Sequence, residues 1–494
     1  MTAVPLSESS LAVLPEAVRR PAYDRASAGC GVVHLGVGAF HRSHQAVYFD
    51  RLLALGHAGW GITGVGVLGA DRPLHAALRA QDGLYTLVLK APDGSIEPAV
   101  VGSLLELLLL DDDPEAVLAA MAAPRTRLVS MTITEGGYST DKSTGLFRLD
   151  DALAADLTSP RPRTAFGLLT EALRRRRAAG TPPFTVVSCD NVESNGDLTR
   201  QTLLEFARLQ EVRTGDGLAD WIAASVAFPN SMVDRITPAT TDEDRGRLTA
   251  ETGLVDRWPV VAEPYLQWVL EDRFSDARPP LEEVGVQLVE DVHPYELMKL
   301  RLLNASHQVM SYLGYLAGHR RVDEVMADPL FAELVERYMR VEATPTLPPV
   351  PDTDLGEYRR SLLERFANPA VSDTLARNCA EGSERIATFV LPVIREQLAA
   401  GGPCDLAVLA VAGWARYAGG IDEDGNPIPV VDARSDRLAP LLRLQDEDPL
   451  AVLTSGEVFG DLADDERFRR AYSRAAELLD RYGARGAAMR ILSA

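Results

Sequence analysis

Short apolar runs alternate with helical patterns from about residue 31 to 290, and this alternation limits the possible folds more than any other feature of the sequence. Strands that alternate with helices form a mostly parallel, doubly wound sheet. Such a sheet binds its ligands at the carboxyl ends of its strands. We expect a helix over 40–55 and strands over 31–38, 60–67, 86–90, 127–134 and 184–189.

From about residue 289 onward, long helical patterns replace this alternation. A chain of 494 residues is too long for one ordinary core. We therefore predict an α/β protein with a Rossmann-type dinucleotide-binding domain over 1–288 and a mainly α-helical substrate-binding and catalytic domain over 289–494. The helical patterns in the second domain cover 295–318, 323–341, 357–378, 383–400, 404–418 and 465–483.

A Gly-x-Gly motif lies between the first expected strand and the following helix. At this place a dinucleotide pyrophosphate binds to the amides that begin a helix. His41 occupies the position of the usual third glycine, so the motif by itself also fits a tight turn. The candidate cofactor contacts in this segment are Gly36, Gly38, Ala39, Phe40 and Arg42.

Asp71 follows the second expected strand, where an acidic side chain would bind the ribose hydroxyls of NAD. It fits equally well as the N-cap of a helix over 74–79. The neighbouring Arg72 could instead bind the 2′-phosphate of NADP. The sequence therefore favours NAD, with NADP as the alternative.

Polar loops follow the later strands as well. They cover 134–138, 188–191 and 228–238, and the first of them contains Glu135, a further candidate cofactor contact. Asn191 can donate an amide hydrogen to an oxyanion. Each loop alone also fits a capping or turn role, but loops after successive strands indicate one binding edge.

Lys299, Asn304 and His307 lie in an otherwise mostly apolar helical run. At about 100° per residue, Asn304 lies about 140° around the helix from Lys299, and His307 falls between them. All three can therefore face one site, where burial should lower the lysine pKa and produce a general base. The alternative is a solvated lysine, a surface asparagine and a core histidine.

Composition excludes several other functions. The net charge of −21 argues against nucleic acid or an anionic membrane as a partner. We find no secretory signal and no apolar stretch of about 20 residues. Four scattered cysteines predict a reducing, cytoplasmic location. His41 and His44 have no third ligand of suitable type nearby, so we expect no metal.

Ordered blocks along nearly the whole chain resemble the polyol-specific long-chain dehydrogenases, which include mannitol 2-dehydrogenases and fructuronate reductases. The blocks run from GVGAFHRSHQ to AGWARYAGGIDEDGNPI, and the most specific is AFPNSMVDRITP around Asp234 and Arg235. MTITEGGY, SCDNVESNGD, VAEPYLQWVLEDRF and MKLRLLNASH resemble the family almost as closely. The resemblance implies metal-independent, nicotinamide-dependent oxidation of a sugar alcohol at C2, or the reverse reduction, by an enzyme that is often monomeric.

The resemblance also implies roles for individual residues. Lys299 would be the general base, Asn191 and Asn304 would hold the developing alkoxide, and His307 would orient the substrate. Glu296 would relay the proton outward. The implied substrate contacts are Asp234, Arg377 and Arg385, and Arg385 stands where the mannitol enzymes usually carry a lysine, which changes the shape of the cation.

The substrate is the open question. Two blocks, VVAEPYLQWVLEDRF and ATPTLPPVPDTDL, resemble mannitol 2-dehydrogenases and favour mannitol and fructose. Arg301 resembles the fructuronate reductases, and an arginine suits a carboxylate. Arabinitol and glucitol are further candidates. A nucleotide-binding sensor without activity is the alternative from another class, although such a protein would have no need for Lys299.

Overall fold

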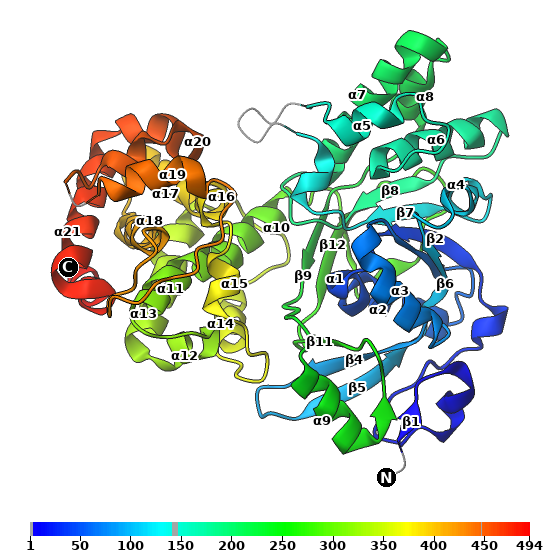
Figure 1. Ribbon diagram of the computed structural model, residues 1–494, viewed down its shortest axis with the longest axis horizontal. Coiled ribbons are helices and arrows are strands. Elements are labelled where there is room, and N and C mark those ends of the chain that lie inside the picture. The colour runs from blue at the N-terminus through cyan, green and yellow to red at the C-terminus, as the bar shows by residue number, and fades with distance from the viewer. Residues whose placement is uncertain (1–2, 141–146, 446) are drawn as a thin grey trace. The chain divides into compact units, whose positions relative to one another are not determined.

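A five-stranded, all-parallel sheet forms the centre of the first part of the chain (Figure 1). Its strand order, β6-β3-β2-β7-β8, is the Rossmann order, with the switch of direction between β2 and β7. The fold class predicted from the sequence is confirmed. The strands are β2 (Cys30–Leu35), β3 (Gly61–Gly66), β6 (Leu104–Leu109), β7 (Leu128–Met131) and β8 (Thr185–Ser188).

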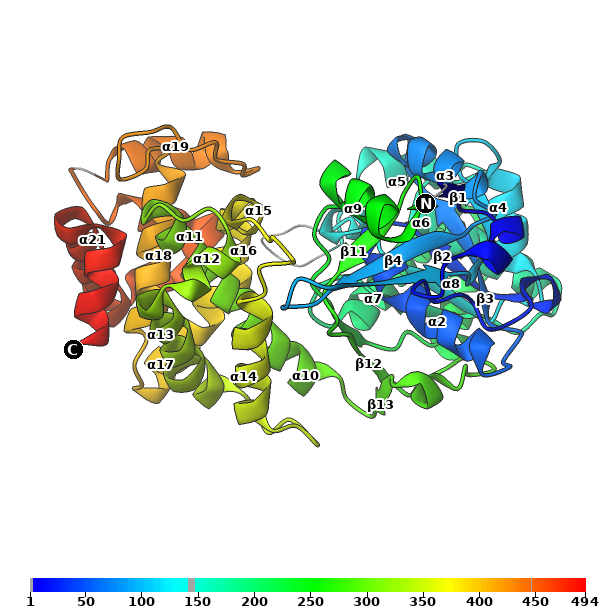
Figure 2. The ribbon, with the colours of Figure 1, turned by 90° about the horizontal axis from the view of Figure 1, so that it is seen from below.

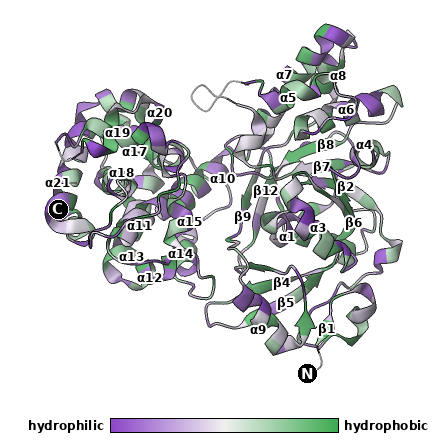
Figure 3. Ribbon diagram, in the orientation of Figure 1, coloured by the Kyte–Doolittle hydropathy of each residue, from purple (hydrophilic) through white to green (hydrophobic). Residues whose placement is uncertain are grey.

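Both faces of this sheet are buried, which explains why its strands are almost uninterrupted apolar runs (Figure 3). Successive side chains point to opposite faces. Val33 and Leu35 pack in one core with α4, α6, α7 and α8, whereas Val32 packs in another with α2 and Trp268. The helices of this part are α1 (Ala39–Ser43), α2 (Gln45–Ala54), α3 (Arg72–Arg79), α4 (Pro114–Ala122), α5 (Asp151–Asp156), α6 (Ala165–Ala178), α7 (Asn195–Thr214), α8 (Leu218–Ser225) and α9 (Asp242–Thr252).

One predicted strand belongs to a different sheet. The run at 86–90 forms β4 (Tyr85–Lys90), but β4 pairs with β5 and β11 in a separate three-stranded sheet. The third strand of the central sheet is instead β6, whose leucine-rich sequence LLELLL fits a helix as well as a strand. The other strands are β1 (Val4–Pro5), β5 (Ile96–Val101), β9 (Ser231–Asp234), β10 (Leu254–Val255), β11 (Val260–Ala262), β12 (Gln267–Glu271) and β13 (Gln287–Val289).

The computed structural model describes residues 3–140, 147–445 and 447–494. It divides into two compact units, Met1–His293 and Pro294–Ala494. The predicted boundary at 288/289 lies slightly before this division, which falls within α10 (His293–Met298).

The second unit is made of helices, as the sequence predicts (Figure 2). Every residue of α11 is buried, and α11 packs against α15 and α18. None of the helices among the described residues is both long and apolar enough for a membrane span. The helices are α11 (Ala305–Leu316), α12 (Val322–Ala327), α13 (Pro329–Arg337), α14 (Leu355–Phe366), α15 (Leu375–Cys379), α16 (Gly382–Arg385), α17 (Leu391–Ala400), α18 (Asp405–Ala418), α19 (Ser435–Arg443), α20 (Gly456–Phe459) and α21 (Glu466–Leu492).

Three segments of the second unit are π-helical turns, in which the backbone hydrogen bonds span five residues. Two of them interrupt helical patterns that the sequence predicts as continuous, and the third lies at the end of such a pattern. The turns are Lys299–Asn304 (η6), Tyr338–Ala343 (η7) and Ile386–Val390 (η9).

Candidate active site

The loop after β2 has two glycines with different structural roles. Gly36 has φ +94°, and a Cβ atom there would lie 2.2 Å from the Thr132 carbonyl oxygen, so the close approach of β7 requires glycine. Gly38 is exposed, and a Cβ atom on it would meet nothing within 4 Å. Gly38 is also the N-cap of α1, whose first amides have no partner within the helix. The loop therefore leaves room and donors for an anionic ligand.

His34 is hydrogen-bonded to this loop and to the end of the neighbouring strand β7. Its Nδ1 lies 2.8 Å from Ser130 Oγ, and its Nε2 lies 3.0 Å from the Gly36 carbonyl oxygen. The Thr132 hydroxyl donates to the same carbonyl at 2.8 Å. The His41 ring stacks on His34 with centroids 3.4 Å apart. Burial lowers the pKa of His34 to about 3, so the ring stays neutral. His41 replaces the third glycine because its ring belongs to this buried stack.

Arg42 differs from the other candidate cofactor contacts because its side chain is buried. Ala39 is exposed and Phe40 half-buried, but Arg42 is only 2% exposed. Its Nη1 donates to the Trp258 carbonyl at 2.8 Å, and its carbonyl accepts from the Tyr85 hydroxyl at 2.6 Å. Arg42 therefore joins the helix start to the protein core.

The expected helix over 40–55 is also divided, because the backbone at His44 leaves the helical region between α1 and α2.

Asp71 lies just beyond the carboxyl end of β3, the neighbour of β2. Its Oδ2 accepts the Leu68 amide at 2.9 Å, and its side chain makes no capping bond to α3. Arg72 forms an ion pair with Asp112 at 2.8 Å. The N-cap interpretation of Asp71 therefore lacks its hydrogen bond, and the guanidinium expected as an alternative phosphate ligand is paired with a carboxylate.

Asp190 fixes the loops that follow β7 and β8. Its carboxylate accepts the Ile133 amide at 3.1 Å, the Thr134 amide at 2.9 Å and the Tyr138 hydroxyl at 2.7 Å. Asn191 is the next residue and is exposed. The loops after β7 and β8 therefore lie at one edge of the central sheet, as predicted, whereas the predicted loop at 228–238 instead contains β9, a strand of a separate sheet. The side chain of Glu135 lies outside the described part of the structure.

The segment around Asp234 places a carboxylate at the end of β9. Asp234 is 3% exposed. The neighbouring Arg235 donates from Nε to the Glu263 carbonyl at 2.9 Å and from Nη1 to the Ser43 carbonyl at 2.5 Å. Burial lowers the pKa of Arg235 to about 10, so it remains charged at neutral pH. Arg235 thus joins this strand to α1.

In the second unit, Lys299 and Asn304 begin and end a π-turn. The Ala305 amide donates to the Leu300 carbonyl five residues back, so five residues complete little more than one turn. The predicted separation of about 140° is therefore wrong, and Asn304 lies closer to the face of Lys299 than a regular helix allows. Glu296 lies one α-helical turn before Lys299, and both residues are 5% exposed.

Asn304 Oδ1 and His307 Nε2 are buried and make no hydrogen bond within the described part of the chain. The ring of His307 meets the Phe366 ring with centroids 4.7 Å apart. Burial lowers the pKa of His307 to about 4, against the opposing effect of Asp373. At neutral pH the ring is uncharged, so the two unpaired atoms are suited to binding the hydroxyl groups of a ligand.

Cationic side chains lie around His307. Arg377 donates to both carboxylate oxygens of Asp373, at 2.7 and 2.6 Å, and its side chain is 46% exposed. Arg385 donates from Nη1 to the Asn378 carbonyl at 3.1 Å. The positive charges of Arg377 and Arg385 contribute to the lowered pKa of His307. The structure thus brings both predicted arginines close to the predicted substrate-orienting histidine.

Arg301 has its hydrogen-bond partners outside this group. Its guanidinium forms two hydrogen bonds with Glu396, at 2.9 and 2.5 Å, and another with the Thr346 carbonyl. Its side chain is only 7% exposed. The contacts of Arg301 are therefore those of an internal ion pair.

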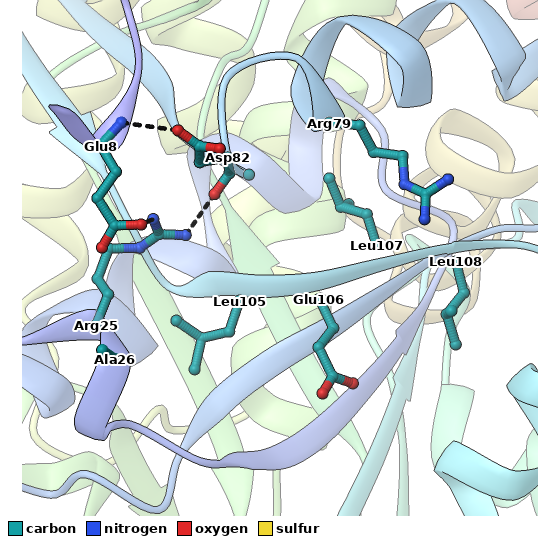
Figure 4. Close-up of a pocket in the computed structure, with 10 residues that line it drawn as sticks. Glu8, Arg25, Ala26, Arg79, Asp82, Leu105, Glu106, Leu107 and Leu108 are labelled. Carbon is teal, nitrogen blue, oxygen red and sulfur yellow. Dashed lines mark hydrogen bonds and ion pairs between the residues drawn. The ribbon is translucent and has the colours of Figure 1, made fainter. Parts of the chain in front are cut away.

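A separate hollow of about 510 Å³ lies beside β6 in the first unit (Figure 4). Arg25 lines it and donates to the carbonyls of Gly102, Asp82 and Leu104. None of the candidate site residues lines it. Among the described residues, no group of three or more histidine, cysteine or acidic side chains is placed to hold a metal ion.

A nucleotide-binding sheet with an open glycine loop, and a helical unit with a buried lysine beside two unpaired polar groups, are the parts of a two-domain dehydrogenase. The chain belongs to the mannitol dehydrogenase family: the model of the mannitol dehydrogenase Rossmann domain matches residues 30–283, and that of the mannitol dehydrogenase C-terminal domain matches residues 291–480. The resemblance stated from the sequence is confirmed.

Relatives and solved structures agree with this assignment. The mannitol 2-dehydrogenase of Phaeosphaeria nodorum is 46% identical, with 94% of this chain and 82% of that protein covered. The Pseudomonas fluorescens mannitol 2-dehydrogenase, solved as a ternary complex with NAD and D-mannitol, is 42% identical with a TM-score of 0.91, covering 99% of this chain and all of that one. A D-sorbitol dehydrogenase solved without substrate is 36% identical with a TM-score of 0.89, covering 98% of this chain and 100% of that one.

Proposed function

We propose that the protein is an NAD-dependent, metal-independent mannitol 2-dehydrogenase that interconverts D-mannitol and D-fructose. The observation that supports this most directly is the buried Lys299 on the same π-turn as Asn304, whose Oδ1 has no partner, with the unpaired Nε2 of His307 one α-helical turn further on. The 42% identical Pseudomonas fluorescens enzyme was solved with NAD and D-mannitol.

Lys299 is the proposed general base. Its amine accepts the C2 hydroxyl proton during oxidation and returns it during reduction. Bound NAD⁺ would supply the hydride acceptor. Glu296, one turn earlier, is the proposed relay that passes the proton outward. Oxidation of an alcohol places negative charge on its oxygen, so the amides of Asn304 and Asn191 are proposed as donors to that oxygen.

The remaining polar groups are proposed to position the substrate. His307 is neutral, so its Nε2 can donate to or accept from a hydroxyl. Asp234, Arg377 and Arg385 are proposed contacts for the other hydroxyls. Because Arg377 and Arg385 already bind Asp373 and a main-chain carbonyl, their orientation is fixed before a substrate arrives.

The residues of the first unit fit a dinucleotide. The open space at Gly38 admits a pyrophosphate close to the backbone, with Gly36, Ala39 and Phe40 in the same loop. Glu135, in the loop after β7, remains a proposed contact. Asp71, just beyond the carboxyl end of β3, is the proposed contact for the ribose hydroxyls. A 2′-phosphate would meet the negative charge of Asp71, so we propose NAD rather than NADP.

A uronate substrate is the second candidate. The observation that favours it is the pair of arginines near His307, because an arginine suits a carboxylate. The bidentate pairing of Arg301 with Glu396 argues the other way, since Arg301 was the sequence feature that indicated fructuronate. Steady-state assays with NADH against fructose and fructuronate separate the two. Turnover of the uronate alone would exclude the mannitol assignment.

Lys299→Ala tests the proposed base. We expect turnover to fall by a factor of about 10² to 10⁴, while NADH binding, measured by fluorescence titration, stays nearly unchanged. Normal alcohol oxidation by this variant near neutral pH would remove Lys299 from the mechanism. Binding of NAD by the wild type without turnover on a broad panel of polyols and uronates would support the sensor alternative.

We also propose that the enzyme is cytoplasmic and is a monomer or a weak oligomer. Four cysteines, Cys30, Cys189, Cys379 and Cys404, are free thiols, which suits a reducing compartment. Light scattering during gel filtration tests the monomer, since a stable dimer would elute at twice the chain mass of 53.5 kDa.

A further inference from the structure

The π-turn at Lys299–Asn304 needs an interaction that holds it. A π-turn is rare in proteins, and the same backbone can relax to the α-helical spacing found on either side of it in α10 and α11. The angle between the side chains of Lys299 and Asn304 depends on whether the turn is π-helical or α-helical, because five residues span a different angle in each kind of helix. Contacts that favour the π-turn therefore bear directly on the proposed base.

Arg301 makes such contacts from the opposite face of the turn. Two residues span close to half a turn in a π-helix as in an α-helix, so Arg301 lies on the opposite face from Lys299. Its guanidinium forms a bidentate pair with Glu396 of α17 and also donates to the Thr346 carbonyl. The guanidinium in the middle of the turn thus binds three oxygen atoms. Two belong to the Glu396 carboxylate and one to the Thr346 carbonyl.

The main chain of Arg301 is held as well. The Tyr338 hydroxyl donates to the Arg301 carbonyl at 3.3 Å, and Tyr338 is fully buried. Tyr338 begins the second π-turn, η7, and η6 contacts both η7 and η9. Side-chain and main-chain contacts at Arg301 therefore connect the turn to three other elements of the same unit, α17, η7 and the short 3₁₀ turn Thr344–Thr346.

We propose that Arg301, paired with Glu396 and supported by Tyr338, is a positioning residue that keeps Lys299–Asn304 in the π-turn and so aligns the general base with Asn304. The proposal rests on the proposed function in taking Lys299 as the base. The Arg301 guanidinium then stabilises the conformation of the turn. Glu396 affects the reaction through Arg301 and not by binding the substrate.

Burial distinguishes this pair from an ordinary surface ion pair. Exposed pairs contribute little because water solvates either partner equally well. Glu396 is 46% exposed, but Arg301 is only 7% exposed, so loss of the carboxylate leaves a nearly buried cation without its main partner. The guanidinium then has to move toward water, and the turn to which it belongs moves with it.

The test uses Glu396→Gln and Arg301→Ala in the full-length enzyme, with Asp461→Asn as the control. Asp461 pairs with Arg395, the residue before Glu396 in α17, and that pair is exposed. The readouts are kcat and KM with mannitol and NAD, the pH profile of kcat/KM, and amide hydrogen exchange over 299–305. Guanidinium at low concentration is added to Arg301→Ala, with sodium chloride as the ionic-strength control.

We expect kcat to fall about 10- to 100-fold in both variants, because small misplacements of a reacting group have effects of this size. We also expect the apparent pKa of the basic group in the profile to move, exchange over 299–305 to accelerate, and guanidinium to restore part of kcat in Arg301→Ala. Asp461→Asn should match the wild type in every readout, and the KM for NAD should stay the same throughout.

Three results would overturn the proposal: kcat within about twofold of the wild type in Glu396→Gln, a loss of kcat with unchanged exchange over 299–305, or an equal loss in Asp461→Asn. If Arg301→Ala does not fold, Glu396→Gln still decides. Wild-type enzyme that is inactive with both polyols and uronates would refute the proposed function instead, and the exchange measurement would then decide separately whether Arg301 and Glu396 hold the turn.

Discussion

Glu342 is a carboxylate buried inside the second unit, and its replacement should change how stability depends on pH. It is 1% exposed, and its two oxygens accept the Leu406 and Ala407 amides, each at 2.8 Å, at the start of α18. Burial raises its pKa from the ordinary 4.5 to about 7; Asp405 raises it further, whereas the two amides and Arg337 oppose the rise.

The size of the effect follows from that pKa. Each pKa unit corresponds to about 1.4 kcal/mol, so the difference between 4.5 and about 7 is worth up to roughly 3 kcal/mol. Because the pKa is higher in the folded state than in the unfolded state, the protonated acid stabilises the fold. This contribution is fully present below about pH 4.5 and is lost as the pH rises through about 7.

Glu342→Gln imitates the protonated acid and should remove this dependence. The glutamine side chain accepts from only one of the two amides, because its Nε2 is a donor, so we expect a constant loss of about 1–3 kcal/mol at every pH. Relative to the wild type, the unfolding free energy of the variant should rise by up to about 3 kcal/mol between about pH 5 and 8.5. Glu336→Gln, which removes the exposed ion pair between Glu336 and Arg340, is the control and should leave the pH dependence unchanged.

Trp414 offers a local reporter for this measurement. It lies on α18, is 1% exposed, and is the one tryptophan of the second unit, the other four preceding residue 294. Incorporated 5-fluorotryptophan gives a separate fluorine NMR signal for it, which Trp414→Phe identifies. Urea unfolding followed at this signal from about pH 5 to 8.5 gives the free energy of this unit. If the unfolding free energies of Glu342→Gln and the wild type depended on pH in the same way, the reasoning would be refuted.

Three further predictions concern the site. Gly36→Ala should weaken NADH binding and lower the unfolding free energy by about 1–3 kcal/mol, because φ is +94° and the new methyl would meet Thr132; fluorescence titration and thermal melting measure this. Asp71→Ala should raise the ratio of kcat/KM for NADP over NAD at least about tenfold by removing a repulsive charge, and an unchanged ratio contradicts the assigned place. His307→Asn should raise the KM for mannitol yet leave the profile between about pH 5.5 and 8 unshifted, since the wild-type ring loses its proton near pH 4.

Much of the central sheet follows from the sequence because burial leaves a clear pattern. Strands β2, β3, β7 and β8 are apolar runs that end in glycine or polar loops, and each was predicted. The exchange of β4 for β6 has a physical reason as well. Both are short apolar runs, and sheet membership depends on pairing partners far along the chain, which local periodicity does not contain.

The site was predicted less completely because its geometry depends on hydrogen bonds. The apolar spacing around Leu300 and Leu303 fits an α-helix and also a helix with one π-turn. The sequence therefore does not predict the hydrogen bond from the Ala305 amide to the Leu300 carbonyl. Arg42 was misleading in a related way. It follows the glycine loop directly, but its side chain turns inward to Trp258.

Arg301 shows how far residue identity and residue direction can differ. An arginine two positions from the general base suggests an anionic substrate, since arginine binds carboxylates in a bidentate manner. The structure contains that bidentate pair, but the carboxylate belongs to Glu396 of the same chain. Because its guanidinium is already paired, Arg301 does not distinguish a polyol from a uronate by direct contact. If Arg301 acts on both reactions only through the angle between Lys299 and Asn304, Glu396→Gln should change turnover of mannitol and of a uronate in the same proportion and leave specificity unchanged.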